Sequence, residues 1–313
     1  MTKIAFLFPG QGSQKVGMGA DFYNEFSSIR ELFDMAEETV KLNLSRLCFQ
    51  GPMETLTETV NLQPALTVVN LAILDAMVQA GVGAQVTAGH SLGEYSALAA
   101  AQSVTREDAF AMVMKRGELM HRESLRNKGA MHAIVGLEIE DILAILPQAQ
   151  EKGIVSVANH NMRQQIVITG SPAAVEAASE MAKARGARAV ALRVSGAWHS
   201  ELIRGAENDF ENYLKRLSFS IPVIPVIHNV SADVVDDPDD IRGLMVQQLC
   251  SPVRWYDTMR KLMDDEVEVY VEVGPGKVLS GLLRKTLPKD YPARLYAVNN
   301  LKSFEVFLKD ALT

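Results

Sequence analysis

The sequence predicts an α/β fold in which a large domain with a mainly parallel sheet carries a smaller inserted βαββαβ unit. Three observations support this fold class. Short apolar segments typical of strands alternate with helical segments along most of the chain. Between residues 129 and 194, by contrast, the predicted strands and helices follow the order βαββαβ. The 313 residues, 48% of them hydrophobic, can bury a large core and a smaller one. We therefore expect a large domain of residues 1–128 and 195–313 and a small subdomain of residues 129–194.

The predicted large domain begins with a strand at residues 3–8 (KIAFLF), and a glycine-containing turn (PGQGSQ) follows it. A helix then begins at Pro64; two polar residues interrupt its apolar run, so we expect a buried helix and not a membrane span. A brief strand near residues 84–89 (AQVTAG) precedes a helix over about residues 105–123. Residues 267–285 (VEVYVEVGPGKVLSGLLRK) predict a buried strand, a Gly-Pro-Gly turn and a helix.

The middle of the chain predicts a compact unit of its own. Its strands are AMHAIVG, GIVSVANHN, QQIVITG and ARAVALRVS, and its helices are EIEDILAILPQAQ and SPAAVEAASEMAKARG. The second helix has Ser171 as its expected N-cap, Pro172 in its first turn and Gly186 at its end. The resulting order βαββαβ is the ferredoxin-like pattern.

Composition excludes several classes of protein. A net charge of -7 argues against a nucleic-acid binder, which usually has a basic excess. Cys48 and Cys250 are far apart and lack a CxxC spacing, so we expect a reduced cytoplasmic protein without disulfides or structural zinc. The N-terminal apolar stretch is too short for a signal peptide. No P-loop, metal-ligand cluster or GxGxxG after a strand is present, so we expect no cofactor and no metal.

Residues 89–93 (GHSLG) match G-x-S-x-G, the strand–turn–helix corner that exposes a nucleophilic serine. The turn is tight, so its flanking positions must be small, and the following helix directs its N-terminal N–H groups at the site. The N–H of Leu92 is a candidate donor to a developing oxyanion. The corner is typical of α/β-hydrolases, so we expect a hydrolase-like large domain. The alternative interpretation of Ser91 is a helix N-cap after a tight turn.

A nucleophilic serine needs a general base, and histidine is the first candidate. His199 lies where the insertion returns to the large domain, and a junction between domains is a favoured place for a cleft. His90 adjoins Ser91, but we expect its side chain to point away from the serine hydroxyl. The remaining histidines are His121, His132, His160 and His228.

Arg116 is the most informative single residue, because it lies on an apolar helical face. Its neighbours three and four positions away are Met112, Val113, Leu119 and Met120. An arginine in such a place is costly unless its charge is matched. Two interpretations remain open: a buried ion pair with an internal acid, or a guanidinium that binds a substrate carboxylate in bidentate fashion.

These motifs together resemble a known family. FPGQGSQ, GHSLGEYSAL, KRGELM, SGAWHS and EVGPGKVLSGLL, in this order, are similar to the malonyl-CoA:acyl carrier protein transacylases of fatty-acid synthesis, over essentially the whole chain. The acyltransferase domains of polyketide synthases are close relatives of that family. The resemblance implies a ping-pong mechanism in which Ser91 attacks the malonyl thioester, with His199 as general base. The malonyl-serine would then pass its acyl group to the phosphopantetheine thiol of acyl carrier protein.

The resemblance also implies roles for other residues. The backbone N–H groups of Gln11 and Leu92 would form the oxyanion hole, and Arg116 would bind the malonyl carboxylate. Gln248, in VQQLCSPVRW, matches the family glutamine near the histidine, whose imidazole is oriented by main-chain carbonyls of that segment. Asn161 matches a further substrate-binding position of the family.

The sequence departs from the family pattern at a few positions. Trp198 precedes the histidine where malonyl-selective relatives usually have phenylalanine, so we expect stronger discrimination against methylmalonyl. Met162 and Arg163 stand where relatives often have Ser-Pro, and Ser251 stands where many have asparagine. The loop shape near Asn161 and the support around the family glutamine are therefore expected to differ.

The implied partners are malonyl-CoA and an acidic acyl carrier protein, with no nucleic acid and no membrane, and we expect a monomer. Because the chain is acidic overall, a carrier protein would need a local basic patch. Candidate residues for this patch are Arg163, Arg188, Lys277, Arg284 and Lys285.

Three alternatives stand beside this interpretation. One is a stand-alone acyltransferase for a polyketide synthase, or the transferase subunit of malonate decarboxylase, which share the chemistry but not the partner. Another is a serine esterase of the α/β-hydrolase type, but there the histidine comes late in the chain, whereas more than a hundred residues follow His199. The third is a catalytically silent scaffold, against which the presence of Ser91, His199 and Arg116 argues.

Overall fold

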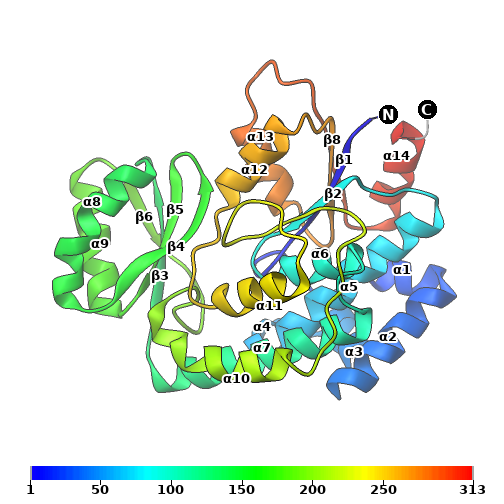
Figure 1. Cartoon of the computed structure of the whole chain (residues 1–313), viewed down its shortest axis with the longest axis horizontal. Helices are drawn as coiled ribbons and strands as arrows, with labels where there is room; N and C mark the ends of the chain where they lie inside the picture. The colour runs from blue at the N-terminus through cyan, green and yellow to red at the C-terminus, as the bar shows by residue number, and fades with distance from the viewer. Residues whose placement is uncertain (1, 312–313) are drawn as a thin grey trace.

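The computed structural model describes residues 2–311, and within them it has two lobes, each built on its own sheet (Figure 1). The larger sheet has the strand order β7-β2-β1-β8-β9, and every neighbouring pair is parallel. Its strands are β1 (Ile4–Phe8), β2 (Val86–Gly89), β7 (Val226–Ile227), β8 (Val269–Val273) and β9 (Arg294–Val298). The predicted α/β class with a mainly parallel sheet is confirmed.

The smaller sheet has the strand order β4-β5-β3-β6, and its paired strands are antiparallel. Its elements follow one another as β3 (Ala130–Val135), α8 (Ile139–Ala149), β4 (Val155–Met162), β5 (Gln165–Gly170), α9 (Pro172–Ala184) and β6 (Arg188–Ala191). This is the predicted ferredoxin-like βαββαβ order. The two helices pack on the sheet around a separate apolar core that includes Ile134, Ile142 and Ile168.

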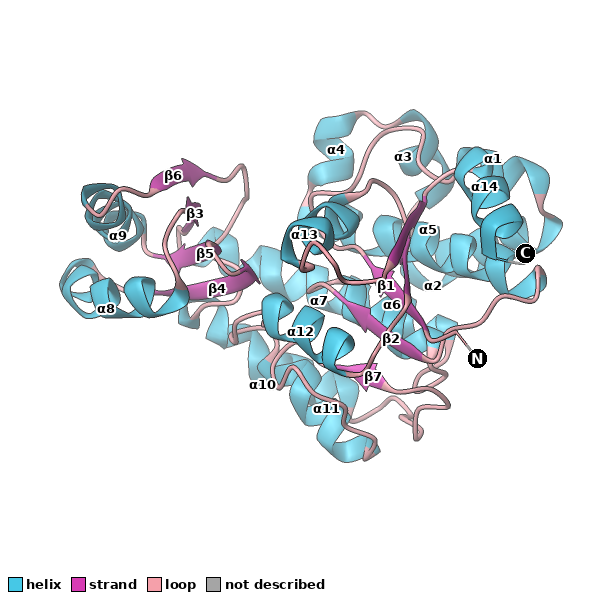
Figure 2. Ribbon diagram, turned by 90° about the horizontal axis from the view of Figure 1, so that it is seen from above, coloured by secondary structure: helices cyan, strands magenta, loops and turns pink. Residues whose placement is uncertain are grey.

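Helices cover both faces of the larger sheet (Figure 2). They are α1 (Ala20–Glu25), α2 (Ser27–Val40), α3 (Leu44–Gln50), α4 (Met53–Thr57), α5 (Thr59–Gln79), α6 (Gly93–Ala100), α7 (Arg106–Arg126), α10 (Glu207–Leu214), α11 (Pro238–Gln247), α12 (Trp255–Asp264), α13 (Val278–Thr286) and α14 (Leu301–Ala311). Short 3₁₀ helices span Gln150–Lys152 and Glu201–Ala206.

Strand β1 shows why this sheet lies in the middle of the molecule. Phe6 and Phe8 point into the core that α5, α6 and α7 share, whereas Ala5 and Leu7 point into the core formed with α12 and α13. Successive strand residues face opposite sides, so a strand that is apolar at every position must be covered on both faces. The result is a rigid platform whose strand ends can position side chains.

Two crossing segments and a main-chain contact join the lobes. A Cβ atom added at Gly129 would lie 2.4 Å from Ala197 N, so the segments that leave and re-enter the larger lobe run side by side. In addition, Val253 N donates to Ala158 O at 2.8 Å, and His160 N donates to Val253 O at 2.9 Å. Strand β4 of the smaller lobe is therefore tied to the larger lobe by its backbone.

Some elements differ from the sequence prediction. Helix α5 begins at Thr59 instead of Pro64, because Asn61 N and Leu62 N already donate to Glu58 O at 2.9 and 2.8 Å. Ser171 stands at the start of α9, but its hydroxyl accepts a hydrogen bond from Ile154 N at 3.2 Å and does not cap its own helix. Strand β7, of only two residues, and strand β9 were not predicted, because their apolar signals in the sequence are weak.

Helix α5 is long and apolar enough to cross a membrane by length and composition alone. In the structure, however, 94% of its apolar window is buried inside the protein. Its interior asparagine, Asn70, donates hydrogen bonds to Pro9 O and Ser96 Oγ, each at 3.1 Å. The helix therefore has the contacts of a core helix, as the sequence predicts.

Candidate active site

The two glycines of GHSLG allow the backbone to turn sharply at Ser91. A Cβ atom at Gly89 would lie 2.0 Å from the carbonyl of Gly93, and one at Gly93 would lie 2.0 Å from Phe8 O. Neither position can therefore carry a side chain. Ser91 itself has φ of 51°, a left-handed conformation that is strained for a residue with a side chain. The strand–turn–helix context predicted for the nucleophile is present, between β2 and α6.

Two backbone amides lie at the same end of the sheet because β1 and β2 are adjacent and parallel. Phe8 pairs with Gly89, so Gln11, just after β1, and Leu92, just after Ser91, both line one cavity. Within residues 2–311, neither amide has a hydrogen-bond acceptor. Leu92 also precedes α6, whose N-terminus is electropositive. The pair can donate to an anion that forms beside Ser91.

His199 is brought to Ser91 from more than one hundred residues away. Its Nε2 lies 2.8 Å from Ser91 Oγ, and its Nδ1 lies 2.8 Å from Gln248 O and 3.1 Å from Ser251 O. Carbonyl oxygens can only accept, so Nδ1 carries the hydrogen and Nε2 is free to accept the serine proton. Burial, followed by the charge of Arg116, lowers the pKa of His199 to about 3, so the imidazole is a neutral base at ordinary pH.

Arg116 lies in α7, is 2% exposed and reaches the serine from the other side. Its Nη1 donates to Gln63 Oε1 at 3.0 Å, and its Nη2 donates to Ser91 Oγ at 3.2 Å and to Gln248 Oε1 at 3.1 Å. No carboxylate of the described residues forms an ion pair with it, and its Nε has no hydrogen-bond partner. Burial lowers the pKa of the guanidinium. Of the two interpretations left open by the sequence, the structure excludes an internal ion pair.

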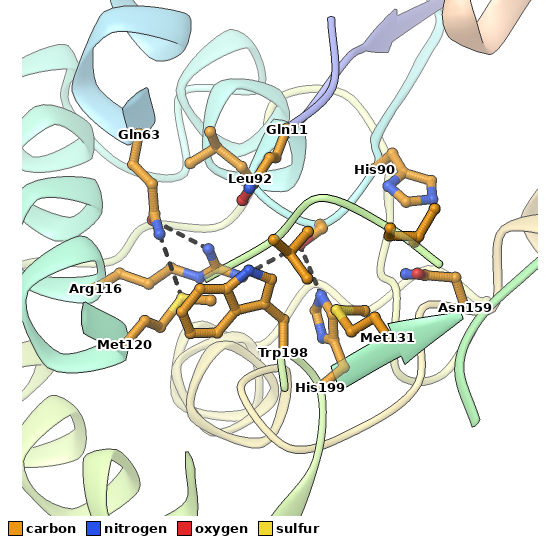
Figure 3. Close-up of a pocket in the computed structure, with 13 residues that line it drawn as sticks. Gln11, Gln63, His90, Leu92, Arg116, Met120, Met131, Asn159, Trp198 and His199 are labelled. Carbon is orange, nitrogen blue, oxygen red and sulfur yellow. Dashed lines mark hydrogen bonds between the residues drawn. The ribbon is translucent and has the colours of Figure 1, made fainter. Parts of the chain in front are cut away.

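These side chains surround a cavity of about 110 Å³ between the two lobes (Figure 3). The larger lobe contributes Ser91, Arg116 and His199, and the smaller lobe contributes Met131 from β3 and Asn159 from β4. A hydroxyl, a neutral imidazole and an unpaired guanidinium thus open into one small space. The arrangement can bind an anionic acyl group and attack its carbonyl carbon.

The other predicted site residues lie at or near this cavity. Trp198 lines it directly and is 4% exposed. Gln248 lies behind Arg116 and does not line the cavity. Asn161 does not line it either: its Oδ1 lies 2.8 Å from Nε2 of His90, whose ring also packs against Trp255. His90 is therefore turned toward the smaller lobe and away from the serine hydroxyl, as expected.

Several residues of the site escaped the sequence analysis. Gln63 holds Arg116, and Asn229 holds the elbow by accepting from Ser91 N and donating to Gly89 O, each at 2.7 Å. Glu94, within the quoted serine motif, is buried and contacts His228. The one usable signal was Gln63, a polar residue beside the apolar run of α5, because polar groups in a buried helix need partners.

The described residues contain no group of three or more His, Cys, Asp or Glu side chains that could hold a metal ion. Both cysteines are free thiols, and burial raises the pKa of Cys48 and of Cys250. Neither thiol is activated as a nucleophile, which leaves the serine as the candidate.

Known proteins resemble this chain in sequence and in fold. The sequence profile of the family described as "Acyl transferase domain" matches residues 5–306. The chain belongs to this family. This acyl transferase domain is 46% identical over 287 residues to the malonyl CoA-acyl carrier protein transacylase of Bacillus subtilis. The alignment covers 91% of this chain and 90% of the relative. It is 40% identical over 307 residues to the transacylase of the same name from Haemophilus influenzae, with 97% of each covered.

Solved structures share its fold over nearly the whole length. The acyl carrier protein S-malonyltransferase of Vibrio cholerae superposes with a TM-score of 0.93 at 39% identity, covering 97% of this chain and 99% of the other. A malonyl transacylase in complex with a type II polyketide synthase acyl carrier protein superposes with a TM-score of 0.94 at 36% identity, covering 99% and 100%. The acyl transferase domain therefore matches these proteins in sequence and in both lobes of the fold.

Proposed function

We propose that this protein transfers a malonyl group from malonyl-CoA to the phosphopantetheine thiol of acyl carrier protein through a malonyl-serine intermediate. One observation carries the proposal: Ser91 Oγ lies 2.8 Å from His199 Nε2 and 3.2 Å from Arg116 Nη2 in a cavity between the lobes. The general base and the cation needed to hold a free carboxylate therefore meet at the same hydroxyl. The names of the relatives support malonyl-CoA as donor and acyl carrier protein as acceptor.

In the first half-reaction, His199 Nε2 takes the proton of Ser91 Oγ as the oxygen attacks the thioester carbon. The carbonyl oxygen becomes an oxyanion and is held by the N–H groups of Gln11 and Leu92. When the tetrahedral intermediate collapses, the carbon–sulfur bond breaks and the imidazolium returns its proton to the leaving CoA sulfur. The products are malonyl-Ser91 and free CoA.

The second half-reaction runs the same steps with the carrier protein. His199 accepts the proton of the phosphopantetheine thiol, and the sulfur attacks the ester carbon. The same amides hold the oxyanion, the bond to Ser91 Oγ breaks, and the imidazolium protonates that oxygen. Because the imidazole is neutral and its Nδ1 hydrogen is held by two carbonyls, it can take up a proton in each half without changing orientation.

Arg116 gives the site its preference for an acyl group with a free carboxylate. Its guanidinium lines the cavity and has no ion-pair partner among the described residues, so its charge remains available to a ligand. A carboxylate held there would also fix the acyl group in one pose, which favours attack by the thiol and leaves little room for hydrolytic water. This proposal explains why the intermediate would survive until the carrier protein arrives.

The finer assignments are also part of this proposal. We propose that residues 129–194 form the small subdomain and that the protein is cytoplasmic. We also propose that the reaction needs no cofactor, since each proton and bond above is accounted for by the substrates and the chain. Fatty-acid synthesis is the favoured pathway. A polyketide carrier protein is the second candidate acceptor, because a similar transacylase has been solved in complex with one.

Mass spectrometry after mixing with malonyl-CoA tests the proposal directly. We expect a malonyl adduct on the peptide that contains Ser91 and none in the Ser91→Ala variant. Adding a phosphopantetheinylated carrier protein should remove the adduct and malonylate the carrier. An adduct on another residue, or none on the unaltered protein, would contradict the proposal. Comparing a fatty-acid carrier with a polyketide carrier separates the two candidate acceptors.

The role of Arg116 is tested by comparing malonyl-CoA with acetyl-CoA. In Arg116→Ala we expect malonyl loading to fall by about 30-fold or more, because truncating one partner of a buried charge pair costs about 2–5 kcal/mol. Acetyl loading should change much less, since acetate has no carboxylate to bind. Arg116→Lys keeps the charge but loses the fork, and we expect an intermediate result. An unchanged malonyl-to-acetyl ratio in Arg116→Ala would refute this role.

A further inference from the structure

A buried carboxylate lies behind Arg116 without touching it. Glu94, the second residue of α6, is 1% exposed. Its Oε2 accepts from Gln248 Nε2 at 2.6 Å and from Asn229 N at 3.3 Å, and its Oε1 lies 2.8 Å from His228 Nδ1. Among the described residues, Glu94 forms its ion-pair contact with His228 and has none with Arg116. A buried acid and a buried cation are thus near neighbours that remain apart.

The side-chain amide of Gln248 occupies the space between them. Its Nε2 donates to Glu94 Oε2 and, at 3.0 Å, to Ser91 O, while its Oε1 accepts from Arg116 Nη2 at 3.1 Å. The opposite flip of the amide would set its oxygen against a carboxylate and a carbonyl, and its NH₂ group against a guanidinium. Its contacts on both sides therefore determine a single orientation.

The separation has a physical consequence for ligand binding. A direct ion pair would occupy the guanidinium, and a substrate carboxylate would have to displace an internal acid. A guanidinium buried with no negative charge nearby would be costly. With one amide in between, the charge of Glu94 adds to the effect of Tyr95 in favouring the protonated guanidinium, and together they partly oppose the effect of burial on the Arg116 pKa. The nitrogen Nε still remains without an internal partner.

We propose that Gln248 is a neutral spacer between Arg116 and Glu94, and that Glu94 is a positioning residue which holds this spacer and compensates the arginine charge without occupying it. This inference rests on the proposed function of Arg116 as the site of the substrate carboxylate. The main-chain carbonyl of Gln248 separately orients His199, so substitutions of its side chain leave that contact available.

An exchange of the two side chains tests the spacer. The double variant Glu94→Gln/Gln248→Glu keeps composition and net charge but moves the carboxylate into direct contact with Arg116. We expect the ratio of malonyl to acetyl loading on Ser91 to fall at least tenfold relative to the unaltered protein, through a higher KM for malonyl-CoA. A ratio equal to that of the unaltered protein would overturn the proposal.

Glu272→Gln provides a matched control. Glu272 is also a 1% exposed carboxylate that accepts hydrogen bonds, here from Leu279 N at 3.0 Å and Ser280 N at 2.8 Å, but it forms no contact with Arg116. We expect its loading ratio to stay unchanged even if the variant is less stable. A fall as large as that of the exchange variant would show a general effect of losing a buried acid and would also overturn the proposal.

A second pair of variants decides the matter if the exchange variant does not fold. Gln248→Ala removes the spacer and lets Glu94 approach Arg116, so the malonyl-to-acetyl ratio should fall; adding Glu94→Gln should then restore it. A double variant no better than Gln248→Ala would overturn the proposal. Failure of the unaltered protein to form malonyl-Ser91 would instead refute the proposed function, so the two failures are distinguishable.

Discussion

Ser91, His199 and Arg116 are each held in a state that is unfavourable for the isolated residue. Ser91 and His199 have φ angles of 51° and 59°, and such left-handed residues cost about 1–3 kcal/mol each. Arg116 is a buried cation with no ion-pair partner in the described chain. The surrounding contacts, such as that of Asn229 with Ser91 N, hold these states in place. Under the proposed function, strain and burial gather at the residues that present reactive groups to a ligand.

The buried imidazole predicts a specific dependence of stability on pH. The pKa of His199 is lowered from 6.5 to about 3 on folding, so between these values the unfolded chain binds one more proton. The free energy of unfolding should therefore be unaffected by this group above pH 6.5 and fall as pH decreases, by up to about 1.4 kcal/mol per pH unit. By pH 4.5 this loss amounts to about 2–3 kcal/mol.

Denaturant unfolding of the unaltered protein and His199→Gln at pH 7 and pH 4.5 measures this effect. The variant should lose less stability on acidification, by the amount given above, because it lacks the titrating group. His90, whose pKa burial also lowers, is present in both proteins and cancels in the comparison. Equal losses in the two proteins would show that the imidazole is not held neutral by folding.

Trp198 predicts discrimination by size within the cavity. Its ring packs tightly: a Cβ atom added at Gly196 would lie 2.7 Å from the indole carbon Cη2. We expect malonyl-CoA to be favoured over methylmalonyl-CoA by about 1–3 kcal/mol in kcat/KM, the usual range for one methyl group. The smaller ring of Trp198→Phe should reduce this preference and leave malonyl transfer active. Equal turnover of both thioesters by the unaltered protein would contradict the prediction.

Contact between α5 and α7 positions the arginine at the scale of secondary structure. A Cβ atom at Gly117 would lie 3.0 Å from Thr59 O and 3.3 Å from the Cα of Val60, so α7 can approach α5 closely only because residue 117 is glycine. This approach brings Arg116 within 3.0 Å of Gln63 on α5. The glycine after the arginine therefore serves helix packing, and through it the site.

Gly117→Val should push the two helices apart. We expect a loss of stability of about 1–3 kcal/mol from overpacking and a lower ratio of malonyl to acetyl loading, because Arg116 moves. Gly243→Val is a matched control: this glycine also lies within a helix, α11, but has no atom within 4 Å of the added Cβ position. The control should keep the loading ratio. Equal ratios in both variants would show that α7 packing does not position the arginine.

At the scale of the whole molecule, the cavity exists only where the two lobes meet. The backbone bonds between Val253 and strand β4 hold the lobes together around it. His160 of β4 also packs against Tyr256 of α12, with 4.9 Å between ring centroids. Contacts of this kind should make the lobes unfold together.

Equilibrium unfolding tests this coupling. Both tryptophans, Trp198 and Trp255, belong to the larger lobe, whereas far-ultraviolet circular dichroism reports both lobes. We expect fluorescence and dichroism to give the same midpoint in denaturant. His160→Ala, which removes the ring contact with Tyr256, should lower both midpoints together. Separate midpoints in the unaltered protein would show that the smaller lobe unfolds independently.

Much of the fold could be predicted because its signals are local. Apolar strands, glycine turns and the order βαββαβ each depend on residues close together in the chain, and the structure contains all of these elements. The two-residue strand β7 and the edge strand β9 could not be predicted, since their pairing with neighbours determines them more than their own residues do. The start of α5 ahead of Pro64 likewise depends on backbone bonds to Glu58.

For the candidate site, the sequence alone determined the serine corner, since GHSLG needs glycines on both sides of Ser91, and it marked Arg116 as a cation out of place on an apolar helix. It could not determine what surrounds that cation. Only the tertiary structure decided that Gln63 and Gln248 are its partners, that Glu94 is kept one amide away and that Asn161 contacts His90. The physical reason is that burial and charge pairing depend on distances in space, and these join residues more than a hundred positions apart.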